Sequence, residues 1–140
     1  MQSFEYQYNS DSAALRIIRQ DLKALLQQAG FEKDELDSVI VAVNEACMNI
    51  VQHADNGHYD GCIDMRIMID AARVSFEIED NAEYVNLDSL TFTKKDKLSP
   101  GGLGLFFINE IMDDVVYSHK QASQGNRLLM TKVLNKHNEI

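Results

Sequence analysis

Two polar residues stand four positions apart within a strongly apolar stretch of this chain. Glu45 and Asn49 fall in residues 34–53, where Val39, Val43 and other apolar residues recur at helical spacing. Positions i and i+4 share one face of a helix, so the two side chains should project together. A carboxylate there could act as a general base beside an amide oxygen that binds Mg²⁺, an ion that usually takes only one or two protein oxygens. The pair could equally be a polar stripe at the edge of a sheet.

Asp80 closes a pattern of alternating apolar residues. Residues 63–69 and 74–78 each alternate between apolar and polar side chains, which predicts an antiparallel hairpin that ends at this aspartate. A carboxylate at the end of a strand could accept a hydrogen bond from the exocyclic amine of a purine. It could also simply start a turn, because Asp80-Asn81 is a turn-favouring pair.

A glycine-rich segment, Gly101-Gly102-Leu103-Gly104-Leu105, follows a long polar stretch at 81–99. Glycines let the backbone approach a phosphate closely, and the start of a helix offers unpaired N–H donors. The segment is not a dinucleotide fingerprint, since no βαβ unit precedes it, and it lacks the Lys and Ser/Thr of a P-loop. A long loop inside a small domain often acts as a lid, so we expect residues 81–99 to cover a ligand.

These residues need a scaffold, and the rest of the sequence predicts one α+β domain spanning residues 1–140. The expected fold is a two-layer sandwich of helices on a mixed, mostly antiparallel sheet. Asp55-Asn56-Gly57 predicts a turn after the second helix, and Gly30 should cap the first. The predicted helices cover 13–29, 34–53 and 103–112, and the predicted strands cover 4–8, 63–69, 74–78, 115–118 and 128–133.

Composition limits the function further. The formal net charge of -9 argues against nucleic acid as the main partner, although a metal ion and a few local donors could still bind phosphates. Cys47 and Cys62 show no metal-ligand spacing, so we expect buried, reduced thiols. The N-terminus has no signal-peptide pattern and no apolar run could span a bilayer. We therefore expect a cytoplasmic protein with no membrane or nucleic-acid partner.

Taken together, the motifs resemble a known family. Residues Ala42–Ala54, the glycine segment and Met112-Asp113-Asp114 follow in the order found in Bergerat-type ATP-binding proteins, which include gyrase-type ATPases, chaperones, histidine kinases and anti-sigma kinases. The resemblance covers nearly the whole chain and is greatest for the anti-sigma serine-kinase branch. It implies ATP and Mg²⁺ as cofactors and a Bergerat ATP-binding fold.

The resemblance also implies roles for individual residues. Glu45 would be the base that activates the accepting serine hydroxyl, Asn49 would hold Mg²⁺ against the ATP phosphates, and Asp80 would read the adenine amino group. Residues Gly101, Gly102, Leu103, Gly104 and Leu105 would close over the phosphates.

An arginine on the first helix reaches the terminal phosphate in this branch. Counting back from Glu45 without gaps places Arg19 at that position, with Arg16 one turn earlier as the alternative. A fixed cation suits the charge that develops on a transferring phosphoryl group. Asn44 stands where serine or threonine is frequent.

Two departures from the family affect the adenine pocket. Ala82 replaces a usual glycine two residues after Asp80; as the smallest replacement it should still let adenine fit at this cofactor-binding position, with weaker binding. The family's adenine-holding threonine on the last strand corresponds to Arg127, beside Asn126, with Thr131 four residues beyond as the remaining candidate.

The implied function is that of a regulatory serine-protein kinase in a partner-switching system. It would phosphorylate a serine on a small STAS-type antagonist protein, sequester a sigma factor or an equivalent target, and form a homodimer. The alternative is a non-catalytic binding module of the same fold, which the changes at Ala82 and Arg127 favour. A sensor histidine kinase is disfavoured, because the first predicted helix contains no histidine.

Overall fold

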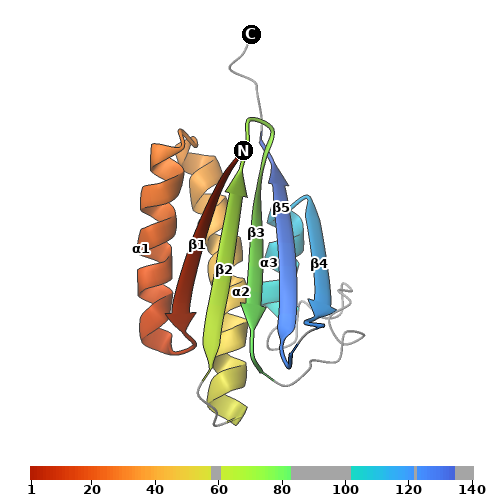
Figure 1. Cartoon of the computed structure of the whole chain (residues 1–140). Coiled ribbons are helices and arrows are strands. Elements are labelled where there is room, and N and C mark those ends of the chain that lie inside the picture. The colour runs from red at the N-terminus through yellow and green to blue at the C-terminus, as the bar shows by residue number, and fades with distance from the viewer. Residues whose placement is uncertain (58–60, 83–101, 122, 135–140) are drawn as a thin grey trace.

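The chain forms a sheet with helices on one of its faces (Figure 1). The computed structural model describes residues 1–57, 61–82, 102–121 and 123–134, with the backbone alone at 53–57 and 102–105. The strands are β1 (Gln2–Asn9), β2 (Cys62–Ile69), β3 (Arg73–Asp80), β4 (Asp114–His119) and β5 (Asn126–Val133). The helices are α1 (Ser12–Gln28), α2 (Lys33–Gly57) and α3 (Gly102–Ile111). The predicted α+β sandwich is confirmed.

The sheet is antiparallel rather than mixed. Its order is β1-β2-β3-β5-β4, and each pairing within the described residues is antiparallel. Helices α1 and α2 between β1 and β2 carry the chain along the sheet and back, so β2 must run opposite to β1. The other neighbours include two hairpins, β2-β3 and β4-β5, which are antiparallel by construction.

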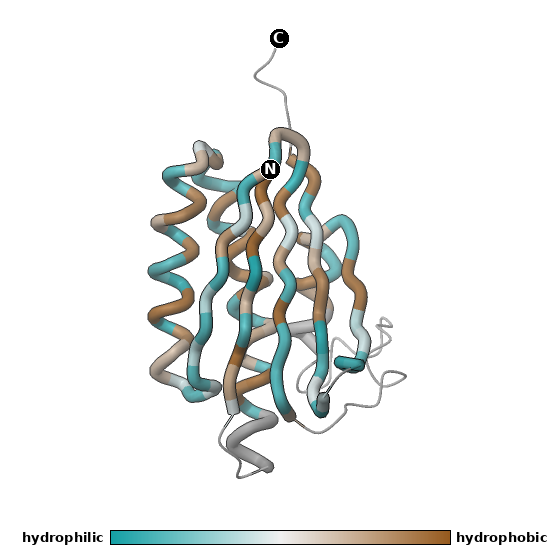
Figure 2. The backbone as a smooth tube through the Cα atoms, in the orientation of Figure 1, coloured by the Kyte–Doolittle hydropathy of each residue, from teal (hydrophilic) through white to brown (hydrophobic). Residues whose placement is uncertain are grey.

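The central strands β2 and β3 alternate between apolar and polar side chains, as the brown and teal of Figure 2 show. The helix-facing side chains of β2 and β3 include Ile63, Ile67 and Phe76, all at 0% exposure. Their neighbours along the strands point to the opposite face, which no helix covers in Figure 1. The hydrophobic core therefore lies between the sheet and the helices. The outer face is mostly polar over β2 and β3 and carries the exposed Val116 and Val133 on β4 and β5.

Helix α1 begins and ends as its sequence predicts. Asp11 is the N-cap, and its Oδ1 accepts a hydrogen bond from the Ala14 N–H at 2.9 Å. Just after the C-terminal end of α1, Gly30 adopts φ +90°, and the Phe31 N–H donates a hydrogen bond to the Leu26 carbonyl at 3.1 Å. Only glycine adopts this backbone conformation at low cost, so the predicted cap is confirmed.

Helix α2 is longer than predicted. It continues to Gly57, so the turn expected at Asp55-Asn56-Gly57 is wrong. Asn and Gly are common at helix C-termini as well as in turns, and here they form the last helical turn. The fully buried side chains Val39, Val43 and Cys47 hold α2 against the sheet. Core packing therefore fixes the position of α2, and with it the backbone of the polar residues on its partly exposed side.

Candidate functional site

The predicted base and metal ligand lie one turn apart on α2. Glu45 and Asn49 are both half-buried, beside the fully buried positions Val43 and Cys47. Neither makes a hydrogen bond or ion pair to another residue in the described part of the chain. A half-buried carboxylate without a partner costs stability, which is unusual for a purely structural stripe. No described residue therefore occupies the polar atoms of this pair.

Asp80 is held by a compact set of donors. It is 7% exposed, and its Oδ1 accepts from the Ala82 N–H at 3.0 Å, from the Asn126 N–H at 3.2 Å and from Asn126 Nδ2 at 3.1 Å. The bond to Ala82 is the aspartate turn that the sequence offered as the alternative interpretation, so Asp80 does form a turn. Its second oxygen, Oδ2, accepts no hydrogen bond from the residues that the structure describes. Among the described residues, one carboxylate oxygen of Asp80 has three donors and the other has none.

Asn126 is a site residue that the sequence interpretation missed. Its side chain is 7% exposed and lies on the helix-facing side of β5, against Asp80. Gly125 just before it has φ +145°, and a Cβ there would stand 2.0 Å from the Asp80 carbonyl oxygen. Glycine is therefore required for the two segments to approach this closely. The signal was present in Gln124-Gly125-Asn126, a turn-type sequence directly before a strand.

Arg127 points away from this group. It faces the uncovered side of the sheet, where its guanidinium pairs with Glu77 Oε2, and this contact raises the pKa of Arg127. Successive residues of a strand face opposite sides, so Asn126, not Arg127, projects beside Asp80. The predicted equivalence of Arg127 with an adenine-holding residue is corrected accordingly.

Thr131 also lies outside the group. Its Oγ1 is 3.2 Å from the Ser75 hydroxyl on the uncovered face, and it pairs with Ser75 in the register of β3 and β5. Ser75 is five residues from Asp80, roughly 17 Å along an extended strand. Both the face and the distance separate Thr131 from Asp80, so its assignment as a nucleotide contact is corrected.

Ala82 stays close to Asp80, as its position in the sequence predicts. It is 2% exposed, and its backbone N–H holds the carboxylate. The neighbouring Asn81 accepts a hydrogen bond at Oδ1 from the Cys62 N–H at 3.0 Å, which ties the end of β3 to the start of β2. The segment that leaves Asp80 is therefore fixed at its first two residues.

Arg19 contacts α2 directly next to Glu45. Its Nη1 donates to Asn44 Oδ1 at 2.9 Å. Arg16 is exposed and makes no hydrogen bond or ion pair to any described residue. Of the two arginines considered from the sequence, Arg19 is the one that lies against the helix carrying Glu45 and Asn49.

The glycine segment opens a helix, as predicted. Helix α3 begins at Gly102 and is anchored by Ile108 at 0% exposure and by Met112, just after its last residue, at 5%. In Figure 1 its first turn lies toward the end of the molecule where β3 and α2 end. Gly101 and most of the predicted lid, residues 83–99, lie outside the described residues, as do the side chains at 102–105.

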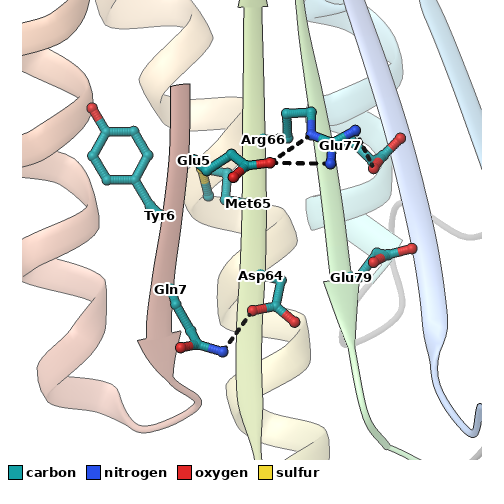
Figure 3. Close-up of a pocket in the computed structure, with 8 residues that line it drawn as sticks. All are labelled: Glu5, Tyr6, Gln7, Asp64, Met65, Arg66, Glu77 and Glu79. Atoms are coloured by element: carbon teal, nitrogen blue, oxygen red, sulfur yellow. Dashed lines mark hydrogen bonds and ion pairs between the residues drawn. The ribbon is translucent and has the colours of Figure 1, made fainter. Parts of the chain in front are cut away.

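A separate hollow of about 390 Å³ lies on the uncovered face of the sheet (Figure 3). Arg66 Nη2 stands 3.1 Å from Glu5, and Gln7 Nε2 donates to Asp64 at 2.9 Å. These four side chains form an ion pair and a hydrogen bond with one another. The hollow lies on the opposite face of the sheet from the Asp80 side chain. It is not part of the candidate nucleotide site.

The sequence predicts two buried cysteines, and the structure buries one of them fully. Both cysteines are free; Cys47 is fully buried, whereas Cys62 is half-buried at the start of β2. Burial raises the pKa of the Cys47 thiol to about 12. Among the described helices, none combines the length and the apolar character needed to cross a membrane.

Known proteins resemble this chain in both sequence and structure. The serine-protein kinase RsbW of Bacillus licheniformis is 34% identical over 130 residues, covering 86% of this chain and 78% of the relative. RsbW of Listeria monocytogenes is 31% identical over 129 residues, covering 84% and 78%.

The fold recurs in solved structures of lower sequence identity. A crystal structure of the RsbU and RsbW domains of a Mycobacterium tuberculosis protein matches with a TM-score of 0.69 at 15% identity, over 95% of this chain and 32% of that chain. The SiaB–SiaC complex of Pseudomonas aeruginosa matches with a TM-score of 0.63 at 16% identity, over 92% and 88%. At these identities the likeness concerns the fold alone.

The histidine kinase-like ATPase domain family matches residues 8–132, which include every described residue of the candidate site. The identity to the RsbW kinases extends over most of both chains. This chain belongs to the histidine kinase-like ATPase domain family, in the branch of the RsbW serine-protein kinases.

Proposed function

We propose that this chain is a regulatory serine-protein kinase that binds Mg²⁺-ATP and phosphorylates a serine on a small STAS-type antagonist protein. In the alternate state of the switch it sequesters a sigma factor or an equivalent target. The observation that carries the proposal is the Asp80 carboxylate, which is buried and held at Oδ1, while Oδ2 accepts no hydrogen bond from the described residues.

The adenine end of the site is built from Asp80 and its donors. An ionised carboxylate only accepts hydrogen bonds, so Oδ2 suits the amino group of adenine and opposes the carbonyl that guanine carries at the same position. The N–H of Ala82 and the amide of Asn126 hold the carboxylate so that this oxygen stays oriented. A buried polar group matched in this way gives strong discrimination between ligands.

The phosphate end combines a helix start, an amide and an arginine. The N-terminus of α3, at Gly102, would supply backbone N–H donors to the phosphates, and the Asn49 amide oxygen would bind Mg²⁺. The ion supplies positive charge that offsets the charge of the triphosphate. Arg19, on the adjacent helix, would approach the terminal phosphate. Gly101, Leu103, Gly104 and Leu105 complete the proposed phosphate segment.

Glu45 would be the general base. Its carboxylate takes the proton of the serine hydroxyl as the serine oxygen bonds to the terminal phosphorus, while the bond from that phosphorus to the bridging oxygen breaks and ADP leaves. Since Glu45 has no partner among the described residues, its oxygens are free to accept that proton.

The non-catalytic alternative loses part of its support. It depended on changes at Ala82 and Arg127, but Arg127 pairs with Glu77 on the opposite face of the sheet and does not obstruct the Asp80 side. The SiaB–SiaC structure, a complex between two proteins, is consistent with a chain of this fold that binds a protein partner. A cytoplasmic location and a homodimeric state are part of the same proposal.

Calorimetric titration with a non-hydrolysable ATP analogue, with and without Mg²⁺, tests nucleotide binding first. We expect micromolar affinity that depends on Mg²⁺ and is weakened by Asn49→Ala. Transfer from γ-labelled ATP to a purified STAS-type antagonist then tests the kinase. Glu45→Ala should reduce transfer by about 10²–10⁴-fold while the analogue still binds. Full binding without any transfer in the wild type would favour the non-catalytic module, and unchanged transfer by Glu45→Ala would exclude this residue as the base.

A further inference from the structure

An amide bridges the two helices beside the candidate site. Asn44 Oδ1 accepts from Arg19 Nη1 at 2.9 Å, and Asn44 Nδ2 lies 3.3 Å from the Met48 sulfur. A guanidinium has donors only, so the amide must turn its oxygen toward Arg19 and its nitrogen toward Met48. Both ends of the Asn44 side chain are therefore fixed.

Arg19 depends on this contact for its orientation. Its side chain is exposed, and Asn44 is the one hydrogen-bond partner that the described part of the chain gives it. No carboxylate of the described residues forms an ion pair with Arg19. A neutral amide restrains the guanidinium without cancelling its charge, whereas an aspartate at the same position would neutralise it.

The helices on either side of the contact are anchored in the core. Ile18, next to Arg19, and Val43, next to Asn44, are both at 0% exposure in the core between the helices and the sheet. Core packing therefore restrains the helix backbones at Arg19 and Asn44, and the long Arg19 side chain keeps the most conformational freedom. The hydrogen bond to Asn44 restricts the conformations of the Arg19 side chain.

We propose that Asn44 is a positioning residue that holds the Arg19 guanidinium, still fully charged, beside Glu45 for contact with the terminal phosphate of ATP. The inference depends on the proposed function, because it concerns the phosphate end of the same site. Asn44 itself touches no phosphate; it acts through Arg19.

The test compares affinities for a triphosphate and a diphosphate. The probes are Mg²⁺-ADP and Mg²⁺ with the non-hydrolysable imido analogue of ATP, titrated calorimetrically into the full chain. We expect Arg19→Ala to lower the preference for the triphosphate about tenfold or more. Asn44→Ala should lower it about threefold to tenfold and leave the ADP affinity unchanged.

A double-mutant cycle separates positioning from a general structural effect. Asn44→Ala should add nothing in the Arg19→Ala background, since its effect passes through that side chain. Asn44→Asp keeps an acceptor but should also lower the preference, because it neutralises the arginine. Arg16→Ala, which removes an exposed arginine one turn away, is the matched control and should leave the preference unchanged. Asn44→Ser, too short to reach Arg19, replaces Asn44→Ala if that variant does not fold.

The outcomes separate this inference from the proposed function. If the wild type binds neither nucleotide, the proposed function fails and this inference fails with it. Two results would leave the proposed function standing and exclude Asn44 as the positioning residue, provided that the wild type prefers the triphosphate. In the first, Asn44→Ala retains that preference. In the second, Asn44→Ala lowers the preference as much in the Arg19→Ala background as in the wild type.

Discussion

Replacing Asn126 tests whether the side chain that the structure places beside Asp80 controls nucleotide affinity. Asn126→Ala removes the 3.1 Å bond from Nδ2 to Asp80 Oδ1 and keeps the backbone donor of the same residue at 3.2 Å. The Ala82 N–H also remains. The carboxylate therefore loses one of its three donors, and the substitution leaves the fold of the strand in place.

The size of the effect follows from burial and charge. A hydrogen bond to a charged group contributes about 1.5–3 kcal/mol, and both residues are only 7% exposed, so water replaces it poorly. Because two donors remain, we expect a loss near the lower end, about 1.5 kcal/mol. If the loss falls on the nucleotide-bound state, it weakens affinity about tenfold. If it falls on the free protein, the melting temperature drops by about 4–8 °C.

Arg127→Ala is the matched control, one residue along the same strand. Its guanidinium pairs with Glu77 on the other face and is 43% exposed, so its loss should cost less than about 1 kcal/mol and leave nucleotide affinity unchanged. Calorimetric titration with the ATP analogue and thermal denaturation of both variants give the comparison. Weaker binding by Arg127→Ala together with unchanged binding by Asn126→Ala would refute the assignment of faces.

Three further predictions concern stability and reactivity. Gly125→Ala should destabilise the fold by about 3 kcal/mol in chemical denaturation, since φ is +145° and the added Cβ would meet the Asp80 carbonyl; a change below about 1 kcal/mol would contradict this contact. In thiol alkylation read by mass spectrometry, Cys62 should react before Cys47, whose pKa is raised to about 12 by burial; equal rates in the folded protein would contradict its burial. Burial also raises the pKa of Tyr117 to about 12, so the folded state favours the neutral phenol. Its stabilising contribution is full below about pH 10 and is lost as pH rises toward 12, which alkaline denaturation curves of the wild type and Tyr117→Phe should show; parallel curves would contradict it.

Much of the fold could be predicted because local patterns and tertiary structure agree. Asp11 and Gly30 terminate α1 by chemistry that acts within a few residues, and the alternation of β2 and β3 assigns their core faces directly. The end of α2 was predicted less well. Asp55-Asn56-Gly57 suits a turn and a final helical turn alike, and nothing local distinguishes them.

The residues of the candidate site also fall into two groups, those predicted from the sequence and those assigned only by the tertiary structure. The sequence by itself determined the helical pair Glu45 and Asn49, the aspartate at the end of a strand and the glycines that open α3, because each depends on spacing within one element. It also determined the family, through long motifs.

Only the tertiary structure decided which residue of β5 faces Asp80. Side chains of a strand alternate between faces, so an error of one position transfers the role from Asn126 to Arg127 on the opposite side of the sheet. The contact between Arg19 and Asn44 likewise joins residues 25 positions apart, and it exists because α1 and α2 pack side by side. Pairings between elements depend on register and packing, which no local pattern encodes.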